Sequence, residues 1–300
     1  MRVIEYESPR GRAPAPRSCC ATFRAALIGS LAVVALASVG GCATRNQLDF
    51  VPARSGSPIG DFLSAYVEGE QQEWTFEGAE IVEVDVESVN GDVIIVADPR
   101  YKNTRVTMLP QAVNGYERGD EAKAAVTRVT AQVDKVPGDL GPRIEVRTST
   151  TDPEPYYIRA HVTIEAPSIE GVRVRTSRGN VMLKNVAGAI DVSTTGGNVR
   201  LMTPQPLVKP VTIVNKDGDI DYRVRGESTG YFDMATVGGI IKLRCRYGRW
   251  IAVDPGNTQD RMVASLNGGE NPVVLRTVDG DIRVAVVSNP MEVGLFIVDP

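Results

Sequence analysis

Five polar side chains recur at one position of a repeated pattern, directly after a glycine, and together could bind a ligand. They are Asp92, Asn180, Asn198, Asp219 and Asp281. Carboxylate and amide oxygens in a row can coordinate a cation or accept hydrogen bonds from sugar hydroxyl groups. However, Ca²⁺ requires about six to eight oxygen ligands, and one side chain per repeat supplies too few. We therefore interpret these residues first as turn residues and second as a weak candidate for a binding row.

Acid–base chemistry is the second possibility that the residue spacing raises. Asp219 and Asp221 are two residues apart, so in a strand both carboxylates would project from one face, roughly 6.5–7 Å apart at Cα. That separation is near the one that glycoside hydrolases use. Pairs of this kind are unavoidable among 37 acidic residues, and no long loop that could form a substrate cleft accompanies this pair. We predict no catalytic residue.

The composition excludes several other classes of site. One histidine, His161, and four cysteines cannot supply a multi-histidine metal site or a cysteine-based zinc cluster within the chain. We expect no metal and no cofactor. The formal net charge of −4, from 33 basic against 37 acidic residues, offers no basic surface for a phosphate backbone. Nucleic acid is therefore not an expected partner.

The elements that would position these side chains belong to a repeat anchored on glycine. Residues seven and five before each anchor, and two and four after it, are apolar or aromatic, and the residue three before it is Ser, Thr or Asn. Steps of two are typical of strands with one buried face. Each unit therefore predicts a strand, a corner in which glycine allows a positive φ, and a second strand. The anchors are Gly91, Gly179, Gly197, Gly218, Gly239 and Gly280.

The spacing of the anchors predicts the fold class. Successive anchors from Gly179 to Gly239 are 18, 21 and 21 residues apart, and 41 residues separate Gly239 from Gly280. We read the last interval as two units, one of them a degenerate coil around residues 250–266. A period of about 20 residues predicts an all-β protein, a β-solenoid or parallel β-helix whose coils stack. The alternative is an antiparallel β-sandwich of hairpins, because pairs such as Asn90-Gly91 are common hairpin turns.

An irregular β insertion near residues 100–165 interrupts this pattern. It contains strand-like runs, such as 143–147 and 157–164, separated by loops with proline and glycine. The ends of a solenoid expose unpaired strand edges, which need a cover. We expect the insertion to cap or widen the array.

The repeat units resemble those of a bacterial family named "putative adhesin", a β-strand-repeat domain of unknown function found in exported proteins. The resemblance covers roughly residues 75–290 and implies a repeat-built all-β body, without naming a ligand. The units that carry it are VESVNGDV at 86–93, VRTSRGNV at 174–181, VSTTGGNV at 192–199 and RTVDGDI at 276–282.

The start of the chain indicates export. A segment with several arginines, residues 2–24, precedes an uncharged run at 25–39. That run is short for a membrane-spanning helix and typical of a signal peptide. The run continues into Val39-Gly40-Gly41-Cys42, which resembles the lipobox of bacterial lipoproteins. This resemblance implies cleavage before Cys42 and lipidation of Cys42. Alanine rather than aspartate at position 43 argues, by the sorting rule of that family, for the outer membrane.

These observations divide the chain into a lipoprotein signal peptide (1–41), a lipidated tether (42–70) and a β-repeat domain (71–300). We predict a non-catalytic lipoprotein of the bacterial cell envelope, held at a membrane by its lipid, whose repeat surface serves adhesion, binding or scaffolding. The expected partners are envelope polysaccharide or another surface protein. The alternative is a carbohydrate-active β-helix enzyme, a lyase or hydrolase, of the periplasm or cell surface.

Overall fold

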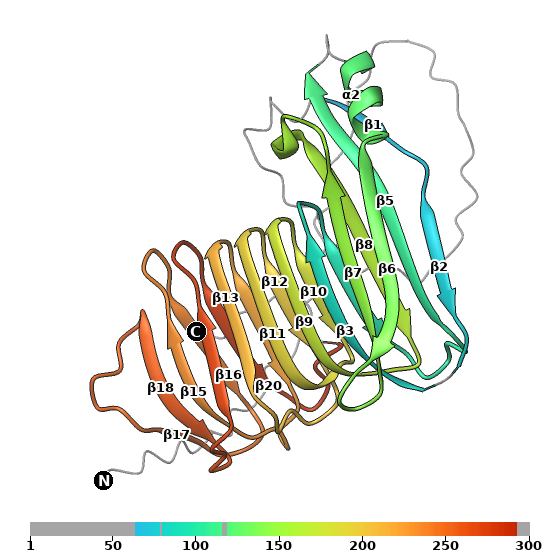
Figure 1. Cartoon of the computed structure of the whole chain (residues 1–300). Helices are drawn as coiled ribbons and strands as arrows, with labels where there is room; N and C mark the ends of the chain where they lie inside the picture. The colour runs from blue at the N-terminus through green and yellow to red at the C-terminus, as the bar shows by residue number, and fades with distance from the viewer. Residues whose placement is uncertain (1–63, 79, 116–118, 293–300) are drawn as a thin grey trace, which may run out of the picture. The chain divides into compact units, whose positions relative to one another are not determined.

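The computed structural model describes residues 64–78, 80–115 and 119–292, which all lie in a compact unit spanning residues 51–300. Within these ranges the chain forms two ten-stranded sheets, sheet A and sheet B, together with an α-helix, α2 (Gly119–Val126), and a short 3-10 helix (Pro155–Tyr157) (Figure 1).

Sheet A is parallel from β8 to β16, and β5 is antiparallel to its neighbours. Its strands lie in the spatial order β1 (Ser64–Glu68), β5 (Thr104–Gly115), β8 (Ile158–Ala166), β4 (Val93–Ala97), β10 (Val181–Lys184), β12 (Val199–Met202), β14 (Ile220–Val224), β20 (Ile282–Val286) and β16 (Ile241–Cys245), and β2 (Gln72–Phe76) also pairs with β5.

Sheet B is parallel from β15 to β7 and has antiparallel strands at both ends. Its spatial order is β17 (Trp250–Ala252), β18 (Arg261–Leu266), β15 (Gly230–Ala235), β19 (Pro272–Arg276), β13 (Val211–Asp217), β11 (Ala187–Gly196), β9 (Ser168–Arg178), β3 (Ile81–Ser88), β7 (Pro142–Thr150) and β6 (Val129–Pro137).

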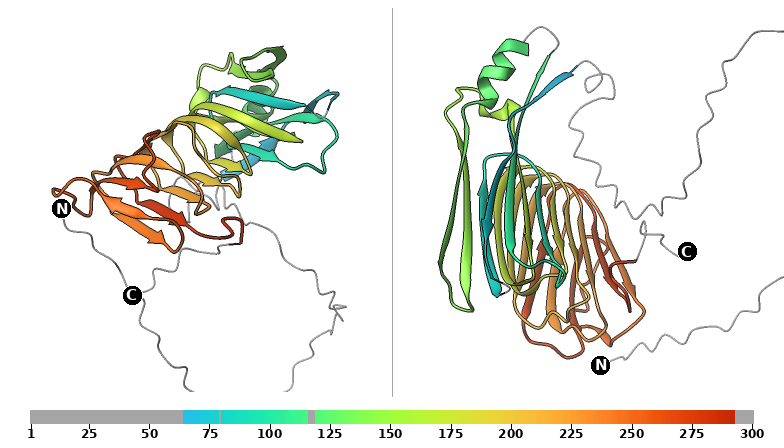
Figure 2. Two further views of the ribbon diagram at one scale, coloured as in Figure 1. Left: turned by 90° about the horizontal axis from the view of Figure 1, so that it is seen from below. Right: turned by 90° about the vertical axis from the view of Figure 1, so that its right-hand side faces the viewer.

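Each repeat unit contributes one strand to sheet B, turns a corner, and contributes the next strand to sheet A. Neighbouring units pair in parallel in both sheets, so the units stack one behind the next (Figure 2). The prediction of an all-β, solenoid-like repeat is confirmed. The antiparallel sandwich is wrong for these units, because the two strands on either side of a corner belong to different sheets and do not form a hairpin.

The units do not stack in sequence order. The unit β19–β20 lies between β13–β14 and β15–β16 (Figure 1). The prediction of a degenerate coil around residues 250–266 is wrong, because β17 and β18 instead form an antiparallel pair on β15. The loop before β18 crosses the last unit, where Ile241 N donates to Gln259 O at 2.7 Å and Thr236 N donates to Asp260 O at 2.9 Å. These bonds occupy backbone groups that an uncovered end would expose.

The segment predicted as an irregular insertion contains a further repeat unit. β7 pairs in parallel with β3, and β8 pairs in parallel with β4. In this unit, β7–β8, the backbone of Ala160 lies against Gly91 of the neighbouring unit. The corner between its two strands is much longer than the corners of the other units. The rest of the segment acts as a cap: β5 and β6 extend the two sheets with antiparallel strands, and α2 packs against β5 and β1.

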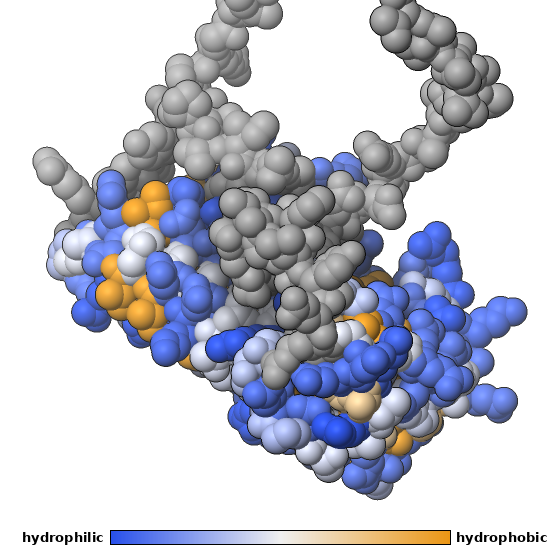
Figure 3. All heavy atoms as spheres, turned by 90° about the horizontal axis from the view of Figure 1, so that it is seen from above, coloured by the Kyte–Doolittle hydropathy of each residue, from blue (hydrophilic) through white to orange (hydrophobic). Residues whose placement is uncertain are grey.

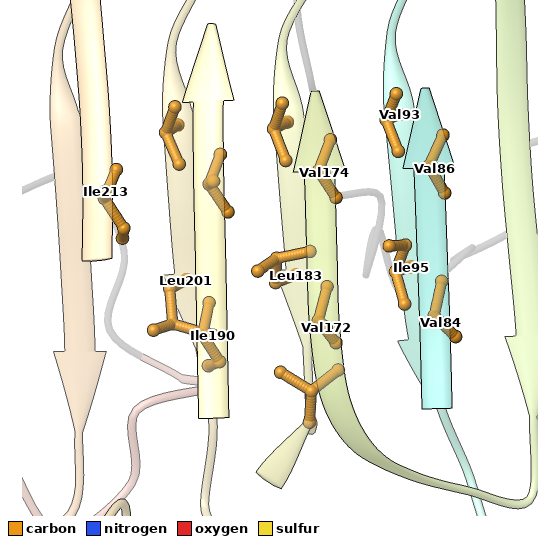
Figure 4. Close-up of a cluster of buried hydrophobic side chains, with 14 of the residues drawn as sticks. Val84, Val86, Val93, Ile95, Val172, Val174, Leu183, Ile190, Leu201 and Ile213 are labelled. Atoms are coloured by element: carbon orange, nitrogen blue, oxygen red, sulfur yellow. The ribbon is translucent and has the colours of Figure 1, made fainter. Parts of the chain in front are cut away.

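The alternation along each strand separates a polar outside from an apolar inside. The face seen from above is hydrophilic over most of its described area, with small separated apolar patches (Figure 3). Between the sheets, aliphatic side chains of sheet B meet those of sheet A (Figure 4). Because full burial of one such side chain contributes roughly 1.5–3 kcal/mol, this core is the main source of stability. Its members include Val86, Val174 and Ile213 from sheet B and Ile95, Leu183 and Leu201 from sheet A, all 0% exposed.

The anchor glycines form a column in which each contacts the next through its backbone. A Cβ atom added to Gly179, Gly197, Gly218, Gly280 or Gly239 would lie less than 3.0 Å from the carbonyl oxygen of the neighbouring anchor. All anchors except Gly239 also have a positive φ, between +109° and +149°. Two constraints therefore select glycine here, and at Gly239 only the close approach applies.

We expect Gly197→Ala to lower the free energy of unfolding by roughly 2–4 kcal/mol, because the new Cβ adds a backbone clash to an unfavourable φ of +109°. Urea unfolding measures the loss. The matched control is Gly268→Ala, whose φ is +69° and whose Cβ would meet no atom within 4 Å; it should cost only about 1 kcal/mol. Equal losses in the two variants would show that the close approach does not constrain the fold.

Candidate functional site

The predicted row of polar corner residues forms a continuous hydrogen-bond ladder along the stack. Each side chain accepts a hydrogen bond from the backbone N–H of the corresponding residue in the next unit. The four bonds run from Asn180 N to Asp92 Oδ1 (2.8 Å), from Asn198 N to Asn180 Oδ1 (2.9 Å), from Asp219 N to Asn198 Oδ1 (2.9 Å) and from Asp281 N to Asp219 Oδ1 (2.8 Å).

Two residues that we did not assign to the row form the ends of the ladder. Asp92 N donates to His161 Nδ1 at 3.2 Å, and Ile240 N donates to Asp281 Oδ1 at 3.0 Å. His161 stands beside Asp92 because β8 pairs with β4. Ile240 belongs to the last unit of sheet A. In the described part of the chain, no further unit follows whose backbone N–H would need an acceptor from its side chain. The places of His161 and Ile240 at the ends of the ladder follow from the strand pairing and could not be read from the sequence.

Burial and hydrogen bonding act in opposite directions on Asp92. Desolvation by burial raises the pKa of this carboxyl, but the nearby His161 imidazole and the hydrogen bonds from Asn180 outweigh it and hold the pKa below its ordinary value. The charged form is therefore favoured by its place in the ladder. Asn180, the next rung, is 1% exposed.

The hydrogen bonds of the ladder occupy side-chain oxygens that a row binding a cation or a sugar would need. One oxygen of each rung accepts a backbone N–H, and successive rungs lie one strand apart rather than around a common point. In the described ranges, no group of three or more His, Cys, Asp or Glu side chains could hold a metal ion. The geometry assigns these residues to the joining of the units.

We expect Asn180→Ala to lower the free energy of unfolding by roughly 1–3 kcal/mol, because it leaves the N–H of Asn198 without its acceptor. The matched control is Ile240→Asn, which restores a polar residue at the end of the row and should change stability by less than about 0.5 kcal/mol. Chemical denaturation of both variants measures the difference. If Asn180→Ala cost no more than the control, the ladder would not stabilise the stack.

The carboxylates of Asp219 and Asp221 do not form an acid–base pair. Asp219 Oδ2 lies 2.8 Å from Arg283 Nη1. Asp221, 5% exposed, lies 2.6 Å from Arg223 Nη2 and 3.3 Å from Arg200 Nε. Each carboxylate is thus held in an ion pair of its own on the outer side of sheet A.

The predicted exported chain has two cysteines, Cys42 and Cys245. Cys42 lies outside the described residues. Cys245 is partly buried against the core, and desolvation raises the pKa of its thiol, which donates a hydrogen bond to Tyr247 O. A raised pKa disfavours the reactive thiolate, so Cys245 is suited to packing.

An open groove of about 460 Å³ crosses the outer side of sheet B. It arises where the strand register shifts, between Val82 and Val84 on β3 and between Ala187 and Ile190 on β11. Such bulges bend strands locally. Gly171 and Gly188 make the bend possible, with φ of +100° and +81°, and a Cβ on Gly188 would lie 2.7 Å from Gly171 N.

Charged side chains from four neighbouring strands line this groove. They are Arg143 on β7, Glu83 and Asp85 on β3, Arg173 on β9 and Asp191 on β11. Pro210 and Thr212 complete the far wall, Ala189 contributes a methyl group, and Gly171 contributes backbone only. Nothing in the sequence distinguishes these residues, because charged residues at outward positions occur along many strands of the repeat.

The acids on β3 are fully engaged within the protein. Glu83 accepts hydrogen bonds from Leu140 N at 2.6 Å and Arg143 Nε at 3.0 Å. Desolvation raises the pKa of Glu83, but these bonds outweigh it and leave the pKa lowered. Asp85 accepts from Arg147 through both oxygens at 3.3 Å. These side chains form a fixed wall.

The fold and the ladder define a solenoid-like repeat protein, and part of its sequence is similar to a known family. Residues 158–285 match the family model described as Toastrack DUF4097. The function of that family is unknown, and the match confirms, over these residues, the predicted resemblance to a β-strand-repeat family of unknown function. In the part of the chain that the structure describes, no helix has the length and hydropathy to cross a membrane.

Two solved structures resemble the chain at low sequence identity. One, described as a putative cell adhesion protein from Clostridium sporogenes ATCC 15579, is 12% identical, with 73% of this chain and 99% of that chain covered and a TM-score of 0.48. The other, a putative adhesin from Bacteroides fragilis NCTC 9343, is 11% identical, with 73% and 97% covered and a TM-score of 0.29. No curated protein matches the chain. We draw no functional conclusion from these similarities.

Proposed function

We propose that this protein is a lipoprotein of the bacterial cell envelope, anchored through Cys42, whose Toastrack domain is a non-catalytic binding or scaffolding surface. In this proposal residues 1–41 are the signal peptide, residues 42–70 are the tether and residues 71–300 form the repeat domain. The lipid would hold the domain at the outer membrane, and the partner would be an envelope polysaccharide or another surface protein.

The outer side of sheet B is the observation that carries this proposal. Side chains in the same register form rows across the parallel strands, with neighbours about 4.8 Å apart. One row places Asp85, Arg173, Asp191 and Thr212 on successive strands, and the next places Glu87, Arg175, Ser193 and Val214 beside it. Such an open, regularly spaced surface suits an extended partner better than the enclosed site that chemistry requires.

The position of the polar groups supports binding rather than catalysis. The corner side chains are used to join the units, and the carboxylates of Asp219 and Asp221 are separately paired. What remains available for a partner is the outward charged surface of the sheets. Its alternating acids and arginines offer donors and acceptors of hydrogen bonds to a polar polymer.

We expect the protein made in a Gram-negative host to begin at Cys42 and to carry the mass of two or three acyl chains. Cys42→Ala should lose that mass and move from the detergent phase to the aqueous phase, because the acyl chains supply the membrane affinity. Cys245→Ala, which removes the other cysteine of that chain, is the control and should stay lipidated. An unlipidated parent protein that starts elsewhere would refute the anchor.

We expect the lipidated protein in detergent to co-sediment with insoluble polysaccharide from the bacterial envelope without degrading it. The binding fraction is measured by centrifugation, and turnover by new reducing ends or unsaturated products in the supernatant. Binding without products is the expected result. Products that accumulate with time would favour the alternative, a carbohydrate-active β-helix enzyme, and the absence of co-sedimentation would refute polysaccharide as the partner.

A further inference from the structure

Two side chains in the groove of sheet B differ from their neighbours in being weakly paired and accessible. Asp191 Oδ2 lies 3.7 Å from Arg173 Nε and 3.5 Å from Arg175 Nη2, near the outer limit for an ion pair. The side chains of Arg173 and Asp191 are 49% and 47% exposed. Among the described residues, no donor forms a hydrogen bond with Asp191 Oδ1. The groove thus offers one unpaired carboxylate oxygen, Asp191 Oδ1, and one weakly paired guanidinium, that of Arg173, beside the fixed wall of Glu83 and Asp85.

The charge of the groove is nearly balanced. Glu83, Asp85 and Asp191 contribute three carboxylates, and the arginines that line the groove or pair with these acids are Arg143, Arg147, Arg173 and Arg175. A strongly anionic polymer would meet three carboxylates, and a polycation would meet four guanidinium groups. Both charged polymers would therefore be repelled by like charges, whereas an uncharged ligand would not.

The backbone around the groove argues against a peptide. An extended peptide that binds by strand addition needs an open sheet edge. Here β3, β9 and β11 are each paired on both sides within sheet B. The groove also has no aromatic lining residue that would anchor an apolar side chain. Recognition must therefore pass through the polar side chains.

A pair of sugar hydroxyl groups fits these side chains. A hydroxyl can donate to Asp191 Oδ1 while its neighbour on the same ring accepts from the guanidinium of Arg173, because each hydroxyl is both donor and acceptor. The volume of about 460 Å³ lies within the range of about 300–1,000 Å³ that small-molecule sites occupy. We propose that this groove is a binding subsite for a neutral glycan, with Asp191 and Arg173 as its recognition pair. This inference rests on the proposed binding function and names its ligand class.

The repeat itself supplies a matched control for this pair. In the same two rows of sheet B, Asp233 forms an ion pair with Arg276 outside the groove. The test uses the full lipidated chain in detergent and compares the double variant Asp191→Asn/Arg173→Gln with Asp233→Asn/Arg276→Gln. Thermal unfolding verifies that both are folded.

The probes are neutral hexasaccharides of glucose, mannose and N-acetylglucosamine, with dextran sulfate as the anionic comparison, and calorimetry measures each Kd. We expect at least one neutral hexasaccharide to bind, the groove variant to raise its Kd at least tenfold and the control variant to change it less than twofold.

Three results would overturn the inference: no binding of any neutral hexasaccharide, binding of dextran sulfate alone, or equal losses in the two variants. The proposed function would survive any of them if the parent protein and the groove variant still co-sediment equally with envelope polysaccharide. Loss of co-sedimentation in the parent protein would instead refute the polysaccharide partner as a whole.

Discussion

The approach of one corner backbone to the next is the constraint on which the rest of this structure depends. Parallel units can stack at the spacing of hydrogen-bonded strands only if their corners also fit at that spacing. At the anchor positions a side chain would overlap the carbonyl of the neighbouring unit. Glycine removes that overlap, and the ladder beside it supplies acceptors for N–H groups that turn out of the strand pairing.

This constraint also divides the polar residues between two tasks. Those at the corners join successive units, and the buried Ser, Thr and Asn three residues before the glycine bond the turning backbone, as Thr277 Oγ1 does to Gly218 O at 3.0 Å. Polar residues on the outer side of sheet B do not form a hydrogen bond of this kind that recurs in every unit. Where the sheet bends at Gly171 and Gly188, they form a concave surface. The residues that join the units and the residues of the proposed binding surface therefore occupy different positions of one repeat.

The two ends of the parallel stack are covered by other elements. At one end β5 and β6 turn antiparallel to their neighbours, and at the other end β17, β18 and the loop before β18 cover the last unit. Open parallel edges would present unpaired N–H and C=O groups to other chains. The solenoid-like core is thus a bounded stack, and the surface proposed for a partner is the outer side of sheet B rather than an end of the stack.

The sequence by itself determined the unit of this fold, and only the tertiary structure decided the order of the units and the position of the groove. Alternation in steps of two and the recurring glycine are local, so strand, corner and strand could be read at each anchor, and the corner residues could be assigned to turns. Pairing between parallel strands has the same chemistry for any two units. Nothing local could therefore place β19–β20 before β15–β16, bring β7–β8 beside β3–β4, or set Asp85, Arg173 and Asp191 in one row.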